Sequence, residues 1–264
     1  MFPLCPIGIV RSPNICDNNC YPFYYQAQIE IMDEFLPGLL RLEENSHIWV
    51  ICLYQKQENA SLHIKPQRHT KNIADFGVFA LRSPNHPNPL SLTLTRLNKI
   101  ENNILYVESL DAYDQTPVLD IKPYSDDDII FSPRMPYIQK EDTRLRQYLM
   151  IKRAVNHHQE ECSGLALAVK MSLWLEDMGI KIQEPSLSII ARGSLCLADS
   201  LQGLGRARLA NPSRFSYQEA AQDGCCFLYQ GQKINIAVKD SIPQDYQTIL
   251  EMSNADLFTL KVSE

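Results

Sequence analysis

Hydrophobic and polar residues follow different periods in the two halves of this chain. In the first half, apolar residues alternate with polar ones, as in Gln28–Met32, or form short continuous runs such as Ile48–Tyr54. Both patterns are typical of strands. The strands expected there are Ile7–Arg11, Gln28–Met32, Ile48–Tyr54, Gly77–Leu81, Ser91–Leu97, Ile104–Leu110 and Pro117–Ile121. Many short strands punctuated by Pro and Gly predict a barrel-like β domain, with one helix around Leu36–Glu44.

Helical spacing takes over after a Pro-rich stretch, Phe131–Tyr137. Asp142 or Thr143 can cap one helix, and Cys162–Met178 carries apolar residues three and four positions apart, which predicts a second helix. The elements expected after it are strands Leu187–Ala191, Phe227–Tyr229 and Lys233–Val238 and a helix near Cys196–Leu201. The alternation of helix and strand indicates an α/β or α+β domain.

Composition fits a globular chain that is large enough for two domains. Of 264 residues, 45% are hydrophobic and 21% are charged, which excludes a disordered chain. We expect domains at 1–138 and 139–264, and the α+β class for the whole. No apolar run reaches ~18 residues, so no transmembrane helix is expected. The start Met1–Pro6 lacks the features of a secretory signal, so the expected location is the cytoplasm, without membrane association.

Charge and cysteine content narrow the class of protein further. A formal net charge of −6 excludes a domain that binds nucleic acid through bulk positive charge. One stretch, 65–99, holds six Lys/Arg and a single acid, as in a solvated loop or an anion-facing rim. The eight cysteines have irregular spacing, which indicates reduced thiols rather than a disulfide framework. Cys52 lies in an apolar run and is expected in the core.

Two segments are dense in polar and proline residues. Arg82 directly follows the expected strand Gly77–Leu81 and precedes three prolines in residues 84–89. These prolines stiffen the loop before any ligand arrives. An arginine at that place can hold a carboxylate or phosphate, or it can form a surface ion pair at a rigid turn. In the second segment, Asp120, Lys122 and Tyr124 fall two apart, so they share one strand face. That face is either a site wall or an exposed edge.

Four segments together are similar to a known family: Ile7–Pro13, Asn45–Trp49, Gly77–Pro89 and Leu110–Tyr124. In order and spacing they resemble the TrmO (YaeB/TsaA-like) family over residues 5–130. The resemblance implies a small β-barrel that binds S-adenosylmethionine and methylates the exocyclic nitrogen of threonylcarbamoyl-adenosine in tRNA. It also implies a homodimer formed through the N-terminal domain, with the cofactor near the subunit interface.

The same resemblance carries site residues onto this sequence. Those expected to form the cofactor pocket are Tyr54, Gln55, Arg82, Leu92, Pro117, Val118, Leu119, Asp120 and Ile121. A sulfonium methyl donor needs positioning and a dry approach line rather than a covalent nucleophile. The acceptor amine needs at most a base, for which Asp114, Asp120 and Tyr124 are the candidates.

The second half resembles another domain. Segments 158–167 and 192–202 are similar to the FmdE-like domain, an α/β domain that takes its name from a formylmethanofuran dehydrogenase. The matching residues His158, Cys162 and Cys196 imply at most one metal ion, zinc or iron; the alternative is a helix start with two buried thiols. His158 and Cys162 share a helix face only if one helix runs through both, and otherwise their geometry depends on a loop. His157 is expected at the surface.

Three functions are compatible with these patterns. The first is an S-adenosylmethionine-dependent methyltransferase acting on tRNA. The second is methylation of a small metal-chelating or thiol metabolite that the C-terminal domain presents. The third is a non-catalytic sensor that binds S-adenosylmethionine or a metal. Affinity for tRNA that falls with salt distinguishes the first from the other two.

Overall fold

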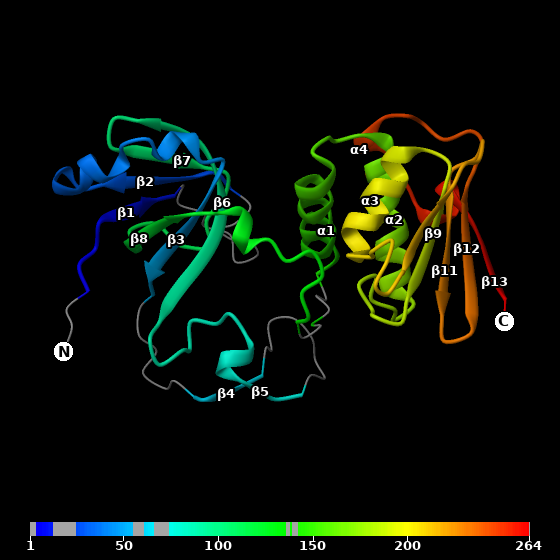
Figure 1. The fold of residues 1–264 in the computed structure, drawn as a ribbon, viewed down its shortest axis with the longest axis horizontal. Coiled ribbons are helices and arrows are strands. Elements are labelled where there is room, and N and C mark those ends of the chain that lie inside the picture. The colour runs from blue at the N-terminus through cyan, green and yellow to red at the C-terminus, as the bar shows by residue number, and fades with distance from the viewer. Residues whose placement is uncertain are drawn as a thin grey trace. The chain divides into compact units, whose positions relative to one another are not determined.

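The structure is a computed structural model that describes residues 4–12, 25–54, 61–65, 74–135, 138 and 142–263. The chain folds into two compact units (Figure 1). The N-terminal unit comprises residues 1–66 and 73–130, and the C-terminal unit comprises residues 67–72 and 131–264. The sequence placed this boundary at 138/139. The expected combination of helices and strands is confirmed.

Six antiparallel strands of the N-terminal unit form a closed barrel in the order β1-β2-β7-β6-β3-β8. Their bounds are β1 (Gly8–Arg11), β2 (Ala27–Ile31), β3 (His47–Leu53), β6 (Leu90–Glu101), β7 (Ile104–Val107) and β8 (Pro117–Pro123). Alternate residues point inward, so Ile48, Val50 and Cys52 of β3 are fully buried. The prediction that Cys52 is a core residue is confirmed. Gly8 opposite Val118 closes the ring between β1 and β8.

Two expected elements of this unit differ in the structure. The expected strand Gly77–Leu81 is reduced to β5 (Phe76–Gly77), paired with β4 (His63–Ile64). The chain then turns in η4 (Val78–Ala80), because the Leu81 N–H donates to the carbonyl of Val78.

The helix expected around Leu36–Glu44 is instead a pair of 3₁₀ segments, η2 (Asp33–Leu39) and η3 (Leu42–Glu44). Pro37 lies inside the first and removes a backbone donor. Arg41 then adopts a left-handed φ of 65° between the two segments, which breaks helical continuity. A third short segment, η5 (Asp126–Asp128), follows β8.

The C-terminal unit packs helices on one face of a five-stranded sheet of order β10-β9-β11-β12-β13 (Figure 1). Its helices are α1 (Thr143–His158), α2 (Ser163–Asp177), α3 (Leu195–Gly205), α4 (Tyr246–Glu251) and α5 (Asn254–Leu257). Its strands are β9 (Ser188–Arg192), β10 (Phe215–Gln218), β11 (Gly224–Tyr229), β12 (Gln232–Val238) and β13 (Phe258–Ser263). Strands β9 and β10 are parallel, and the other pairs are antiparallel. Strands β10 and β13 form the two edges.

Helix ends in this unit follow from local side chains. The Asp142 carboxylate accepts hydrogen bonds from two backbone N–H groups of the first turn of α1, so this predicted cap is confirmed. Helix α1 ends at His158, and Gln159 reverses the chain with a φ of 65°. Helix α2 starts directly after Cys162, whose sulfur accepts from the Leu165 N–H.

Within the described ranges, no helix has the length and apolar character that crossing a membrane requires. The cytoplasmic location expected from the sequence stays a prediction.

Candidate functional site

The outer face of β3 brings together residues from both of its neighbours. Ile51 lies opposite Leu92 of β6 on one side and opposite Asp120 of β8 on the other. Residues directly opposite in antiparallel strands share a sheet face. Because Val50 and Cys52 point into the barrel, the row formed by Leu92, Ile51 and Asp120 points outward.

Arg82 lies over this outward face. Its guanidinium carbon is 5.9 Å from the centre of the Trp49 ring, within the range of a cation–π contact. Its Nη1 also donates to the carbonyl of Leu92 at 3.5 Å. Tyr124 meets the same indole edge-on, with ring centres 6.1 Å apart. Two residues singled out from the sequence, Arg82 and Tyr124, thus contact Trp49, and Arg82 also reaches the backbone of a third, Leu92.

Trp49 was missed as a site residue in the sequence. It occurs in a motif segment, but its central place depends on strand register, which pairs it with Leu94 and Lys122. The available signal was the alternation in β3, where Trp49 shares the outward face with His47 and Ile51.

The expected pocket segment of β8 exposes only some of its side chains. Asp120 forms an ion pair with Lys122 at 2.8 Å, and both side chains are exposed. Val118 is fully buried in the barrel, so only its backbone can touch a ligand on the outer face. The other expected members, Pro117, Leu119 and Ile121, are partly buried.

Two further candidates are held elsewhere in the N-terminal unit. The Tyr54 hydroxyl donates to the carbonyl of Asp111 at 2.5 Å, and burial raises the pKa of Tyr54. Asp114 accepts from the Gln115 side chain at 3.0 Å and from the Ser12 N–H at 3.1 Å. These bonds, the Gln115 contact foremost, lower the pKa of Asp114. Asp114 therefore fixes the turn before β8, whereas Gln55 lies outside the described residues.

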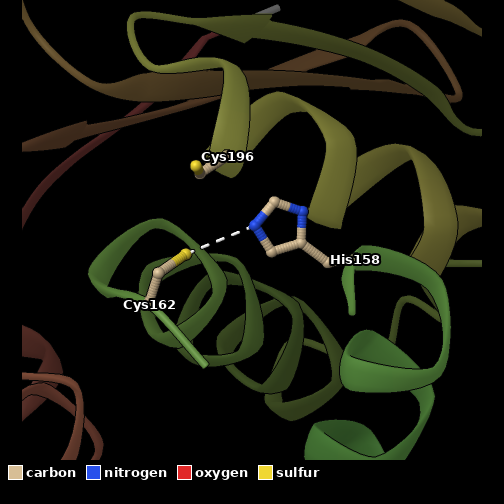
Figure 2. Close-up of side chains that lie close together, drawn as sticks. All are labelled: His158, Cys162 and Cys196. Atoms are coloured by element: carbon tan, nitrogen blue, oxygen red, sulfur yellow. Dashed lines mark hydrogen bonds between the residues drawn. The ribbon is translucent and has the colours of Figure 1, made fainter. Parts of the chain in front are cut away.

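In the C-terminal unit, His158, Cys162 and Cys196 converge from three helices (Figure 2). His158 is the last residue of α1, Cys162 precedes α2, and Cys196 lies in the first turn of α3. The Cys162 sulfur lies 3.3 Å from His158 Nε2. One ligand atom from each residue lies within 4.8 Å of the other two. Of the two geometries considered from the sequence, the structure has the loop, since α1 ends before Cys162.

A glycine permits this approach. A Cβ placed on Gly164 would lie 2.7 Å from the Cβ of Cys196 and 2.7 Å from the Leu197 nitrogen. Any other residue would push the starts of α2 and α3 apart. Burial, followed by the neighbouring Cys162 thiol, raises the pKa of Cys196. A bound cation would relieve the second of these effects.

The donor set fits a borderline-soft metal. Two thiols and an imidazole are ligands that zinc and iron accept. A thiol beside an imidazole that is backed by a carboxylate can also act as a nucleophile. The third donor, Cys196, favours the metal, because a lone nucleophile does not require it.

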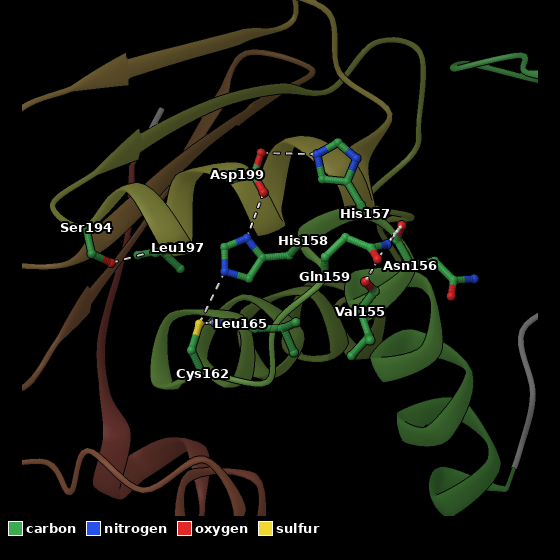
Figure 3. Close-up of polar contacts among 10 residues, drawn as sticks. All are labelled: Val155, Asn156, His157, His158, Gln159, Cys162, Leu165, Ser194, Leu197 and Asp199. Atoms are coloured by element: carbon green, nitrogen blue, oxygen red, sulfur yellow. Dashed lines mark hydrogen bonds and ion pairs between the residues drawn. The ribbon is translucent and has the colours of Figure 1, made fainter. Parts of the chain in front are cut away.

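His157 is not a free surface residue, so that expectation is wrong. Figure 3 shows the Asp199 carboxylate between two imidazoles. Asp199 Oδ2 lies 2.7 Å from His158 Nδ1, and Oδ1 lies 3.2 Å from His157 Nε2. The side chain of His157 is only 24% exposed. The sequence did not reveal these contacts, because Asp199 lies about forty residues further along the chain.

Comparison with known proteins agrees with the motifs of the N-terminal half. Residues 20–128 match the family model of the tRNA-methyltransferase O N-terminal domain. An S-adenosyl-L-methionine-binding protein of Archaeoglobus fulgidus is 38% identical over 127 residues, which cover 46% of this chain and 88% of that protein. A crystal structure of TrmO overlaps 58% of this chain and 74% of its own, with 25% identity and a TM-score of 0.40.

Longer relatives extend further along the chain. A second Archaeoglobus fulgidus protein, named a probable S-adenosyl-L-methionine-binding protein, is 31% identical over 228 residues, or 81% of this chain and 60% of its own length. The mouse tRNA (adenine(37)-N6)-methyltransferase is 35% identical over 167 residues, or 63% of this chain and 37% of its own length. The chain thus spans only part of these two relatives. The shorter Archaeoglobus protein, however, is covered over 88% of its length, and residues 20–128 match the family model. This chain therefore belongs to the tRNA-methyltransferase O N-terminal domain family.

Proposed function

We propose that this protein binds S-adenosylmethionine on the outer face of β6, β3 and β8 and transfers its methyl group to an adenine in tRNA. The observation that carries the proposal is the position of Arg82 over Trp49, beside Leu92. S-adenosylmethionine offers a carboxylate for a guanidinium and an adenine ring for aromatic and aliphatic side chains. Relatives named for binding S-adenosylmethionine support the assignment.

Methyl transfer requires the protein mainly to position the methyl donor and the acceptor. The sulfonium group is already an activated methyl donor, so the protein must hold donor and acceptor in line and exclude water. Of the three candidate bases, Asp120 shares the outward face with Leu92. Asp114 is held in the turn before β8 by the Ser12 N–H and the Gln115 side chain, and Tyr124 packs against Trp49. Asp120 accepts from the Ile121 N–H at 2.9 Å and pairs with Lys122, but it alone of the three lies in the outward row with Ile51 and Leu92. Asp120 is therefore our candidate to accept the proton of the acceptor amine.

The identity of the methyl acceptor is the more specific part of the proposal. Relatives named tRNA (adenine(37)-N6)-methyltransferase support a tRNA adenine, and the motif resemblance of residues 5–130 suggests its threonylcarbamoyl derivative. Methyl transfer from isotope-labelled S-adenosylmethionine into tRNA with and without that modification is the direct test. Label that enters only the modified tRNA supports the proposal. Calorimetry that detects no S-adenosylmethionine binding would overturn it.

We also propose a homodimer formed through the N-terminal unit. Large apolar side chains are exposed there, among them Phe79, Leu90, Leu92 and Tyr113. Phe79 is 76% exposed, so a second chain that covered its ring would remove apolar surface from water. Sedimentation of the full chain is expected to give a dimer, and Phe79→Asp a monomer. A monomeric parent chain would contradict this proposal.

A second function rests on the cluster in the C-terminal unit. We propose that His158, Cys162 and Cys196 hold one zinc or iron ion, as part of an FmdE-like domain. Such an ion could present a small metal-chelating or thiol metabolite for methylation, or serve a sensor. Elemental analysis of anaerobically purified protein is expected to find bound metal, at most one ion per chain. The double variant Cys162→Ser/Cys196→Ser should contain none, and a metal-free parent would assign these residues to packing.

A further inference from the structure

The carboxylate of Asp199 holds two imidazoles at once. Its Oδ2 is 2.7 Å from His158 Nδ1, and its Oδ1 is 3.2 Å from His157 Nε2 (Figure 3). The first distance is short, as charge-assisted hydrogen bonds are. The His158 side chain is 10% exposed and that of Asp199 is 45% exposed. Asp199 thus reaches from α3 into the place where α1 ends.

This contact determines which nitrogen of His158 carries the proton. An ionised carboxylate can only accept hydrogen bonds. His158 Nδ1 must therefore carry a hydrogen and donate it to Asp199. In the neutral ring, Nε2 then keeps its lone pair. That nitrogen is the one that lies 3.3 Å from the Cys162 sulfur, so the lone pair points toward the Cys162 side of the cluster.

His157 and a second glycine hold the carboxylate from the other side. A Cβ placed on Gly203 would lie 2.3 Å from the His157 ring. Any larger residue at this place in α3 would collide with the His157 side chain in the position from which it reaches Asp199. With one imidazole on each oxygen, the carboxylate cannot rotate away from His158 without losing a hydrogen bond.

We propose that Asp199 is a positioning residue for metal binding, with His157 as its second anchor. This inference depends on the proposed metal site. Histidine ligands of zinc commonly donate their second N–H to a carboxylate, which sets the ring orientation and raises ligand basicity. Asp199 does this for His158 before any metal arrives. Removing such a carboxylate lowers metal affinity by about 10- to 100-fold in known sites.

The test measures the affinity of the full chain for Zn²⁺ by competition with a chromophoric chelator. Asp199→Asn is expected to weaken binding by about 10- to 100-fold. Asp199→Glu keeps the negative charge and should recover part of that loss. Asp245→Asn is the matched control, because Asp245 also accepts hydrogen bonds in this unit but caps α4. Its affinity should equal that of the parent.

The visible absorption spectrum of the Co²⁺-bound protein distinguishes a positioning role of Asp199 from loss of the fold. Co²⁺ bound to the parent should show thiolate-to-cobalt charge transfer, and Asp199→Asn should shift the visible bands because the imidazole is no longer fixed. The metal-free variants should melt within a few degrees of the parent. A parent chain that binds neither Zn²⁺ nor Co²⁺ overturns the metal site itself. If the parent binds metal, and Asp199→Asn equals it in affinity and spectrum, only the role of Asp199 is overturned.

Discussion

The candidate residues of the two units are held in very different ways. On the barrel, Arg82 and Leu92 are exposed, and the Asp120–Lys122 ion pair is open to solvent, where such a pair contributes about 0–1 kcal/mol. In the C-terminal unit, His158 and Cys162 lie in a network that joins three helices. Folding alone therefore assembles the second cluster. The barrel face instead presents Arg82 and the paired strand residue Leu92 to solvent, where a ligand or a second chain can reach them.

The largest expected effect comes from Gly164→Ala. The new Cβ would lie 2.7 Å from the backbone nitrogen of Leu197, so α2 and α3 must separate and the cluster must open. We expect a loss of about 3 kcal/mol in the free energy of unfolding of the C-terminal unit. Urea unfolding followed by Trp174 fluorescence, in a Trp49→Phe background, measures this unit alone.

Gly38→Ala is the control for that substitution. Gly38 lies in the N-terminal unit, and a Cβ there meets no described atom within 4 Å. Its unfolding, followed by Trp49 fluorescence in a Trp174→Phe background, should stay close to that of the parent. If Gly164→Ala proved equally neutral, the cluster would not depend on the close approach of the two helix starts.

Arg82→Ala should produce the next largest effect, on binding rather than stability. Loss of a charged hydrogen bond to the cofactor carboxylate should weaken S-adenosylmethionine binding by about 2 kcal/mol. Since Arg82 is exposed, the melting temperature should stay unchanged. Isothermal calorimetry on the full chain checks both the affinity and the stoichiometry.

Arg41→Ala is the matched variant for this experiment. Arg41 is an exposed arginine of the same unit, ion-paired with Glu44 and located between η2 and η3. It should bind S-adenosylmethionine like the parent. Equal losses in both variants would show that general positive charge, rather than the guanidinium over Trp49, attracts the cofactor.

A smaller effect is expected on the free energy of unfolding when the pH rises, because Cys52 lies in the barrel core. Burial raises the pKa of Cys52 from 9.0 to about 11. The folded state thus holds this proton more tightly than the unfolded chain does. Its contribution to stability is complete below pH 9 and is lost as the pH rises toward 11. Between pH 8 and pH 10 the free energy of unfolding should fall by about 1.3 kcal/mol on this account.

The measurement compares the parent with Cys52→Ala at both pH values. Trp49 fluorescence in a Trp174→Phe background follows the N-terminal unit alone. The variant should lack this part of the decrease. A decrease of equal size in both proteins would assign it to other groups of the barrel.

The smallest expected effect concerns the start of α1. Asp142 caps two backbone N–H groups there, and Asp142→Ala should cost about 1 kcal/mol of stability in the C-terminal unit. Asp142→Asn should recover most of it, because Asn is an equally good cap. Thermal unfolding followed by Trp174 tests whether the helix that delivers His158 is anchored at its first turn.

Much of the fold could be predicted, since buried strands and amphipathic helices leave local patterns. The missed strands β10 and β13 are both sheet edges. Phe215–Gln218 has a single buried residue, and Phe258–Ser263 likewise buries only its first. An edge strand that faces solvent lacks the apolar alternation on which prediction depends.

The sites were less accessible to sequence reasoning, for a different reason. Arg82 and Asp120 stand out through the motifs that contain them, but the central place of Trp49 depends on the pairing of β3 with both neighbours. Asp199 and His157 meet across α1 and α3. A hydrogen bond between distant segments is set by helix packing, and no local spacing encodes it.

The closure of the barrel has a consequence for folding during translation. Strand β1 has β8 as its second neighbour, with Gly8 opposite Val118. A ribosome must therefore deliver more than a hundred further residues before the first strand can complete its pairing. Such distant contacts slow folding, and nascent chains with open strand edges are vulnerable to aggregation. Chaperone demand during translation should peak just before β8 emerges.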